Sequence, residues 1–286
     1  MGSRGPDFLV IGGQRSGTTW LSEILREHPR VFSLPIKELH YWDAVDEAHY
    51  SAWNRRFRHL KASLIPVGKG RVGNISWYLK YFFGPINDKY YQNLFPRDLR
   101  KGFVCGDITP GYARLSGSVI QRIKKLFPHM KVIYIVRDPV DRAWSHLARR
   151  LGRKKAVLPI QVSVTDYLNA IGSVPTVLEK SLHSDVIDRW ASHFDNAKLR
   201  VLWFDDIKKR PGKFLDEFCD FCGIQRHDFK LEDNEPKNQS SRGFEMPPEV
   251  RKALLGLFRD EIHNLAEKLS SDIPYEWLRS HETKLR

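Results

Sequence analysis

The chain has 286 residues and a formal net charge of +13 at pH 7, with 41% hydrophobic and 12% aromatic residues. These values exclude an intrinsically disordered protein and favour one large α/β domain or two small ones. The excess of positive charge implies an anionic partner, which is a nucleotide-like cofactor, an acidic substrate, a membrane surface or nucleic acid.

The N-terminus and the apolar runs restrict where the protein is expected to act. No apolar run approaches membrane-spanning length, so we expect no transmembrane helix. The first predicted strand begins at Phe8, which leaves a disordered lead-in over residues 1–6 and no room for a signal peptide. We therefore expect a cytoplasmic location. Three cysteines are too few for a disulfide framework.

Residues 8–20, which read FLVIGGQRSGTTW, predict a phosphate-binding loop. The first four residues are apolar and suit a strand buried on both faces, and a helix should follow from Thr18 or Thr19 to about His28. A strand, a glycine-rich loop and a helix N-terminus in this order direct backbone N–H groups and the helix dipole toward an anion. Arg15 adds a positive charge at the centre of the loop.

Several alternatives for this loop stay open at the level of the residues. Gly12 and Gly17 have the spacing of the ATP-binding pattern GxxxxGK[ST], but Thr18 stands in the place of the lysine. A hydrophobic stretch that ends in Asp205 and Asp206 resembles a metal-binding strand end, which supports a nucleotide kinase or other NTPase. The remaining candidates are an ordinary βα turn and a basic module that binds polyanions.

A short strand at residues 31–34 leads into the segment PIKELHYWD, which contains Lys37, Glu38 and His40. A lysine, a carboxylate and an imidazole near a phosphate-binding loop suit general acid/base chemistry. Since one residue separates Glu38 from His40, an extended backbone would direct both side chains to the same side. The alternative is a surface loop with a chance cluster of polar residues.

An aromatic-rich stretch comes after a predicted helix at residues 46–60. Its Trp77 and Tyr81 suit the core or the wall of a pocket better than a stacking platform for nucleic acid. No common nucleic-acid-binding motif accompanies them, so nucleic-acid binding is a minor alternative.

The clearest core strand is KVIYIV, residues 131–136, and Arg137 follows it directly. Ligands bind at the carboxyl ends of the strands in open α/β sheets, so Arg137 is a candidate ligand contact. Ser145 lies two turns into the helix that comes next. The alternative for Arg137 is a structural ion pair with Asp138 or Asp141.

The rest of the chain continues the alternation of strands and helices. We predict strands at residues 103–107 and 199–204, helices at 116–127, 164–171, 176–194, 214–222 and 249–269, and loops at 151–159 and 234–248. Cys219 and Cys222 lie at the end of a predicted helix, which favours buried core cysteines over a redox pair. We therefore predict a single α/β domain over residues 1–286, with a central parallel sheet flanked by helices and a P-loop-like site.

Two motifs together carry a family resemblance. GGQRSGTTWL at residues 12–21 and IVRDPVDRAWS at residues 135–145 resemble the cofactor motifs of sulfotransferases that depend on PAPS, 3′-phosphoadenosine 5′-phosphosulfate. KELHYWD at residues 37–43 and DITPGY at residues 107–112 are similar to the heparan-sulfate-type and related bacterial branch. The resemblance covers most of the chain. It implies the PAPS sulfotransferase fold and metal-free transfer of a sulfuryl group to a hydroxyl or amine of an acceptor, with PAP as product.

The resemblance also implies residue roles. Glu38 would be the base, with His40 in reserve, and Arg15 would stabilise the leaving phosphate through its charge and hydrogen bonds. The implied cofactor contacts are Arg15, Ser16, Gly17, Thr18, Thr19, Trp20 beside the adenine, Arg137 and Ser145 at the 3′-phosphate, and, in a less similar segment, Ser241, Arg242 and Gly243.

The acceptor is expected to be a small molecule or a carbohydrate, without nucleic-acid binding or membrane insertion. The predicted substrate contacts are Lys37, His40, Trp77 and Tyr81. Ile108 stands where some heparan-type enzymes have a second lysine. We therefore expect the second cationic contact from elsewhere, with Lys37 as the candidate.

Overall fold

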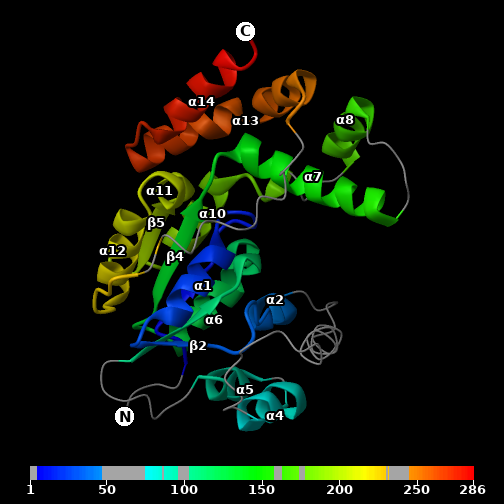
Figure 1. Ribbon diagram of the computed structural model, residues 1–286. Coiled ribbons are helices and arrows are strands. Elements are labelled where there is room, and N and C mark those ends of the chain that lie inside the picture. Colours follow the sequence, from blue (N-terminus) through cyan, green and yellow to red (C-terminus); the bar gives the residue numbers. More distant parts are fainter. Residues whose placement is uncertain are drawn as a thin grey trace.

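The computed structural model describes residues 5–46, 75–85, 87–95, 103–157, 163–173, 178–229, 231 and 245–286. Its centre is a parallel sheet of five strands in the order β2-β3-β1-β4-β5 (Figure 1). The strands are β1 Phe8–Val10, β2 Val31–Ser33, β3 Val104–Ile108, β4 Lys131–Val136 and β5 Leu199–Trp203. All five strands were predicted to within two residues at either end, and every pair of neighbours is parallel.

Strand β1 lies in the middle of the sheet, and the chain extends the sheet from it in both directions. β3 and β2 lie on one side of β1, and β4 and β5 lie on the other. Val10 pairs with both Ile108 and Ile133, so the loops that leave these three strands begin at the same edge. Such a reversal of strand order opens a crevice at the carboxyl ends, where α/β proteins bind ligands.

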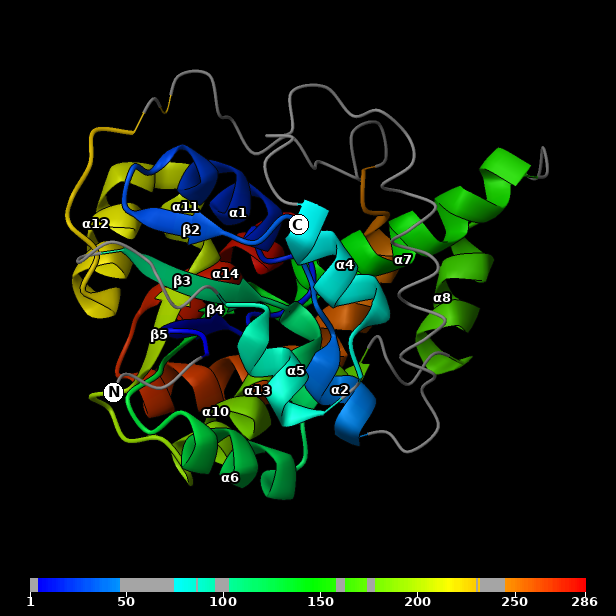
Figure 2. The same ribbon diagram turned by 90° about the horizontal axis from the view of Figure 1, so that it is seen from below.

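Successive residues of β1 pack into two different cores. Leu9 belongs to a cluster with side chains of α6 and α10, whereas Phe8 and Val10 pack with side chains of α1, α11 and α12. Figure 2 shows these two groups of helices on opposite faces of the sheet. The strand is apolar throughout because both of its faces are buried, as its unbroken hydrophobic run predicted.

The described helices cover both faces and one end of the sheet. They are α1 Thr18–Glu27, α2 Tyr41–Asp46, α4 Ile75–Phe83, α5 Asp88–Asn93, α6 Gly117–Leu126, α7 Pro139–Val157, α8 Val164–Ser173, α10 His183–Ala191, α11 Phe204–Lys209, α12 Pro211–Cys222, α13 Pro248–Leu269 and α14 Ile273–Thr283, with a short 3-10 helix, η1, at Pro110–Arg114. None of these helices is both long enough and apolar enough to cross a membrane.

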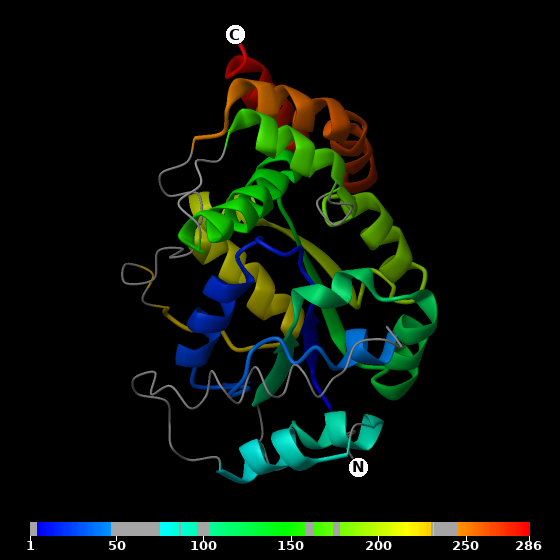
Figure 3. The same cartoon turned by 90° about the vertical axis from the view of Figure 1, so that its right-hand side faces the viewer.

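The helices α13 and α14 pack on α7 at the carboxyl ends of the strands. Val250 and Leu254 of α13 and Leu278 of α14 share a core cluster with Val140 and Leu147 of α7. Figure 3 shows this pair at one end of the molecule and α4 with α5 at the other. The C-terminal helices therefore lie on the same side of the sheet as the loop after β4.

Three predicted elements need correction. Helix α7 continues to Val157, so most of the loop expected at residues 151–159 is helical. The helix expected at residues 176–194 is interrupted by a turn, and α10 begins only at His183. The interruption has a tertiary cause, because the Ser181 hydroxyl in this turn donates to the Pro139 carbonyl at 3.2 Å.

The region around residue 46 also differs from the prediction. Helix α2 begins at Tyr41, five residues before the helix predicted at residues 46–60, and the rest of that predicted helix lies outside the described residues. Asp46 accepts hydrogen bonds from the Ser116 backbone N–H at 2.7 Å and from the Ser116 hydroxyl. Helix α6 begins at Gly117, close to the start predicted at residue 116, and the Ser116 hydroxyl bonds Asp46 and makes no cap hydrogen bond to the helix.

Candidate active site

A cleft opens at the carboxyl edge of the sheet, where the strand order reverses. Its described lining consists of Gln14, Arg15, Gly17, Thr18, Thr19, Trp20, Glu23, Glu38, Pro110, Arg137, Arg149 and Phe204. These residues come from the segments that follow all five strands and from α1 and α7. The parallel sheet thus gathers segments from distant parts of the sequence around one site.

The loop after β1 makes a tight turn into α1. Arg15 and Gly17 both have left-handed backbone conformations, with φ of 76° and 80°. The positive φ of Gly17 favours glycine, and a Cβ there would also lie 2.6 Å from Cδ1 of Ile207 in α11 and displace the end of that side chain. The turn directs the N-terminus of α1, with Thr18 and Thr19, toward the cleft. The first N–H groups of a helix have no acceptor within the helix, and this end favours an anion.

The loop after β1 and the turn after β4 are joined by hydrogen bonds. Arg15 Nε donates to Ser145 Oγ at 3.1 Å, and an Arg137 terminal nitrogen donates to the Arg15 carbonyl at 2.7 Å. The Arg137 guanidinium also lies 4.7 Å from the centre of the Phe204 ring. Among the described residues, Arg137 Nε and Ser16 Oγ are buried without a hydrogen-bond partner.

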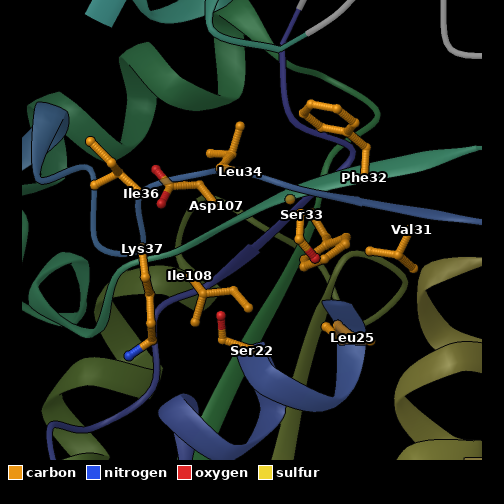
Figure 4. Close-up of a pocket in the computed structure, with 12 residues that line it drawn as sticks. Ser22, Leu25, Val31, Phe32, Ser33, Leu34, Ile36, Lys37, Asp107 and Ile108 are labelled. Carbon is orange, nitrogen blue, oxygen red and sulfur yellow. The ribbon is translucent and has the colours of Figure 1, made fainter. Parts of the chain in front are cut away.

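Lys37 brings a second positive charge to the N-terminus of α1. Its ammonium lies 3.2 Å from the Thr19 hydroxyl oxygen and 2.9 Å from Glu38 Oε1. Figure 4 shows Lys37 and Asp107 on the wall of a pocket between α1, β2 and β3, with the ammonium directed away from the Asp107 carboxylate. That pocket measures about 20 Å³, enough for one water molecule.

Glu38 and His40 lie side by side in the segment before α2. His40 Nε2 is 3.4 Å from Glu38 Oε2, and His40 Nδ1 is 2.7 Å from Asp43 Oδ2. Burial alone would raise the pKa of Glu38, but the contact with His40 and the charge of Lys37 outweigh it and lower the pKa to about 2. Glu38 is therefore ionised at neutral pH.

The backbone of this segment turns, in contrast to the extended backbone assumed from the sequence. Glu38 and His40 have φ of 61° and 54°, which places both in the left-handed region. They face each other because the chain turns, with Asp43 holding the far side of the His40 ring. A Cβ on Gly111 would lie 2.8 Å from Asp43 Oδ2, so the motif DITPGY packs directly against this cluster.

Asp107, at the end of β3, is a buried centre of hydrogen bonds below the site. It accepts from the hydroxyls of Tyr91 at 2.9 Å, Tyr112 at 3.0 Å and Thr109 at 2.6 Å. Burial raises the pKa of Asp107 to about 6, although these donors oppose the shift. The Tyr112 oxygen in turn accepts from the Tyr41 backbone N–H at 3.0 Å and so fixes the residue after His40.

A sequence model described as the sulfotransferase family matches residues 6–228. The chain belongs to the sulfotransferase family. This confirms the resemblance stated from the two motifs, and the observed α/β fold agrees with it.

Curated relatives and solved structures that are similar to this chain are consistent with the family match. The chain is 26% identical over 313 residues to the mouse bifunctional heparan sulfate N-deacetylase/N-sulfotransferase 4, which covers 98% of this chain and 32% of the relative. The chain thus spans about a third of that relative's length. The sulfotransferase from Alicyclobacillus acidocaldarius has a similar structure, with a TM-score of 0.68, 20% identity and coverage of 95% and 98% of the two chains. A mouse sulfotransferase complexed with PAP has a TM-score of 0.52 and 15% identity, with coverage of 96% of this chain and 89% of that chain.

Two buried side chains support the Arg137 turn from behind. His183 Nε2 donates to the Arg137 carbonyl at 2.9 Å, and the Tyr134 hydroxyl donates to His183 Nδ1 at 2.6 Å. Burial and the nearby charge of Arg142 lower the pKa of His183 to about 3, so its imidazole is neutral. These residues were not singled out in the sequence, where buried histidines within a predicted helix carry no distinctive signal.

Several residues predicted for the site lie elsewhere. Trp77 and Tyr81 are 5% and 2% exposed, stack on each other in the core and are absent from the described lining of the cleft, which favours the core interpretation over substrate contact. The Ser16 side chain is fully buried beneath the loop. Ser241, Arg242 and Gly243 lie outside the described residues.

Specific contacts occupy the acidic residues and the cysteine on which three of the alternatives depended. Asp205 accepts from Trp277 Nε1 at 3.1 Å, and Asp206 pairs with Arg210 at 2.6 Å, so both carboxylates have structural partners of their own. Asp138 contacts His281 at 2.6 Å and caps α7, in place of the ion pair with Arg137 that was considered. Burial raises the pKa of Cys219 to about 11, which suits a core cysteine.

Proposed function

We propose that this sulfotransferase moves the sulfuryl group of PAPS to a hydroxyl or amine of a small-molecule or carbohydrate acceptor and releases PAP. The observation that carries the proposal is the connection of Arg15 to both Ser145 and Arg137. It sets a helix N-terminus and the half-buried Arg137 on one cleft, which suits a nucleotide with phosphate groups at two positions.

The residues present fit PAPS. Thr18, Thr19 and Lys37 would hold the 5′-phosphosulfate at the N-terminus of α1, where an anion is favoured. Arg137 and Ser145 would hold the 3′-phosphate, and the buried Arg137 Nε is a donor still available for it. Trp20, which lines the cleft and packs edge-on to Phe214, would lie beside the adenine. PAPS supplies an activated sulfuryl group on a phosphate leaving group.

Glu38 is the proposed base. Its ionised carboxylate would accept the proton of the acceptor hydroxyl as the acceptor oxygen forms its bond to sulfur and the bond from sulfur to the phosphate oxygen breaks. Lys37 and Arg15 would stabilise the negative charge that the departing phosphate gains. His40, held between Glu38 and Asp43, would orient the carboxylate.

The low pKa of Glu38 has a consequence for this mechanism. A carboxylate with a pKa of about 2 is a weak base, and the Lys37 ammonium contributes to that low value. An anionic ligand at the N-terminus of α1 would compete with Glu38 for Lys37, because the same ammonium contacts Thr19. Binding of the donor would then raise the pKa of Glu38, so the carboxylate would be a stronger base in the loaded site than in the empty one.

Thermal unfolding with different nucleotides tests the proposal. PAP should raise the melting temperature with and without EDTA, whereas ATP with Mg²⁺ should raise it much less, and radiolabelled sulfur should pass from PAPS to members of a hydroxyl and amine panel. Arg137→Ala removes the proposed contact to the 3′-phosphate, so this variant should lose most of the stabilisation by PAP. Stabilisation by ATP with Mg²⁺ but not by PAP would contradict the proposal.

A further inference from the structure

A buried chain of side chains links the C-terminal helices to the turn that carries Arg137. Arg251 of α13 donates to His281 Nδ1 of α14 at 2.8 Å, and His281 Nε2 donates to Asp138 Oδ2 at 2.6 Å. Arg251, His281 and Asp138 are 7%, 1% and 7% exposed. Since Nδ1 accepts from a guanidinium, the His281 proton lies on Nε2 and the imidazole is neutral.

The other carboxylate oxygen of Asp138 holds the start of α7. Asp138 Oδ1 accepts from the Val140 backbone N–H at 2.9 Å, as an N-terminal cap does. Asp138 is therefore fixed in two directions, by α7 and by His281. Because Arg137 is the preceding residue, this arrangement also fixes the direction in which its backbone presents the guanidinium.

Two neutral histidines thus hold adjacent residues of one turn. His183 binds the Arg137 carbonyl, and His281 binds the Asp138 carboxylate. A buried ionic chain adds little net stability compared with apolar packing, so orientation of the turn is the better explanation for it. The hydrogen-bonded series Arg251–His281–Asp138 also includes residues beyond residue 228, where the match to the family model ends.

The same carboxylate and imidazole raise the question of a metal site. Ligand atoms of Asp138, Asp141 and His281 lie within 4.8 Å of one another. However, His281 already uses both ring nitrogens, and the Arg251 guanidinium on its far side repels a cation. The hydrogen-bonded chain is the arrangement that these contacts support.

We propose that Arg251 and His281 are positioning residues that, through Asp138, hold Arg137 in place for the 3′-phosphate of the donor nucleotide. The inference rests on the proposed function, because it requires a ligand with a 3′-phosphate. It makes the C-terminal helix pair α13–α14 part of the apparatus that distinguishes PAP from adenosine 5′-phosphate (AMP), which lacks that group. A residue that serves only stability would affect both nucleotides alike.

Asp138→Asn tests this inference with a single change of atom. Asparagine is as good an N-terminal cap as aspartate, but its amide cannot both cap α7 and accept from His281. We expect the ratio of PAP to AMP affinity, measured by titration calorimetry, to fall by about tenfold, the scale on which outer partners tune a ligand contact. Loss of a carboxylate near a phosphate site would by charge alone strengthen PAP binding, so a fall in the ratio reports positioning.

Two further variants serve as rescue and control. His281→Gln keeps one acceptor and one donor and should retain the preference for PAP. Trp277→Phe, also in α14, removes the hydrogen bond to Asp205 and leaves the Asp138 contact in place, so its ratio should match that of the unaltered protein. Arg251→Met, a third variant, removes the hydrogen bond to His281 Nδ1. It should lower the ratio of PAP to AMP affinity as Asp138→Asn does.

Each outcome has a distinct meaning. An unaltered protein that binds PAP no better than AMP would count against the proposed function itself. A normal preference for PAP in the unaltered protein and in both Asp138→Asn and Arg251→Met would overturn the positioning role. Equal losses of PAP and AMP affinity in these two variants would also overturn it, since they indicate a purely structural chain.

Discussion

Lys37 and Glu38 form an ion pair with 2.9 Å between Nζ and Oε1, and the same ammonium lies 3.2 Å from the Thr19 hydroxyl oxygen. One cation is thus shared between the proposed base and the helix N-terminus that suits the donor phosphate. Glu38 has a left-handed backbone conformation with φ of 61°. The chain turns there, so the Lys37 ammonium contacts both the Glu38 carboxylate and the Thr19 hydroxyl.

Replacement of Lys37 by Met should change both binding and the basicity of Glu38. Without the ammonium, burial is opposed only by His40, so the pKa of Glu38 rises from about 2. Activity that needs the carboxylate is lost as pH falls through this pKa, so the acid limb of kcat/KM should move to higher pH. PAP affinity should fall by about tenfold through the lost charge–phosphate contact.

The comparison for this variant is Lys268→Met, which removes an ammonium paired with Asp188 outside the lining of the cleft. Its pH profile and PAP affinity should match those of the unaltered protein. An acid limb that does not move in Lys37→Met would show that Lys37 has no influence on the proposed base, Glu38.

Glu38→Gln should remove turnover while leaving nucleotide binding intact. The amide keeps the size of the side chain but cannot accept a proton, so kcat should fall by about 10² to 10⁴. PAP affinity, measured by calorimetry, should be preserved or slightly increased, since a negative charge beside Lys37 is lost. Turnover that survives in Glu38→Gln but not in His40→Gln would move the role of base to His40.

Arg15 should contribute chiefly through its charge. Arg15→Met should lower kcat by about 100-fold or more, the usual loss when one donor to a developing negative charge is removed. Arg15→Lys keeps the charge but loses the planar guanidinium that places Nε 3.1 Å from Ser145 Oγ. Its kcat should lie between those of Arg15→Met and the unaltered protein. Equal rates for Arg15→Met and the unaltered protein would remove Arg15 from the mechanism.

Asp107 should make stability depend on pH in a specific window. Burial raises its pKa from 3.8 to about 6, so its contribution to stability is fully present below about pH 4 and is lost as pH rises through 6. Asp107→Asn cannot ionise and should flatten this part of the curve, a difference on the order of 2 kcal/mol in the free energy of unfolding between the two ends of the window. Urea unfolding across this range measures it, and identical pH dependence in both proteins would contradict the assignment.

Gly17 and Gly223 provide a matched pair of substitutions. Both have positive φ, 80° and 67°, but a Cβ would meet Ile207 at 2.6 Å at the first and nothing within 4 Å at the second. Gly223→Ala should cost about 1 kcal/mol through the left-handed backbone alone. Gly17→Ala should cost more than about 2 kcal/mol and weaken PAP binding, because the added Cβ displaces the Ile207 side chain and presses on the Phe204 ring 3.1 Å away. Equal costs in chemical denaturation would show that the contact with Ile207 relaxes freely.

The sequence by itself determined the elements whose signal is local. The unbroken apolar runs of β1 and β4 predicted buried parallel strands, since each is covered by helices on both faces. The glycine spacing after β1 and the position of Arg137 directly after β4 placed the candidate ligand contacts at strand ends. The helix predicted to end at residue 222 does end there, and Gly223 follows it in the left-handed conformation that glycine tolerates.

Other features depended on contacts between residues distant in the sequence, and only the tertiary structure decided them. The break before α10 follows from hydrogen bonds of Ser181 to Pro139 and Arg142, which override the local preference for a helix. The mutual approach of Glu38 and His40 requires left-handed backbone that no local pattern encodes. His281 meets Asp138 across 143 positions of the chain. Local propensity does not report such pairings, because their free energy arises only when the sheet brings the segments together.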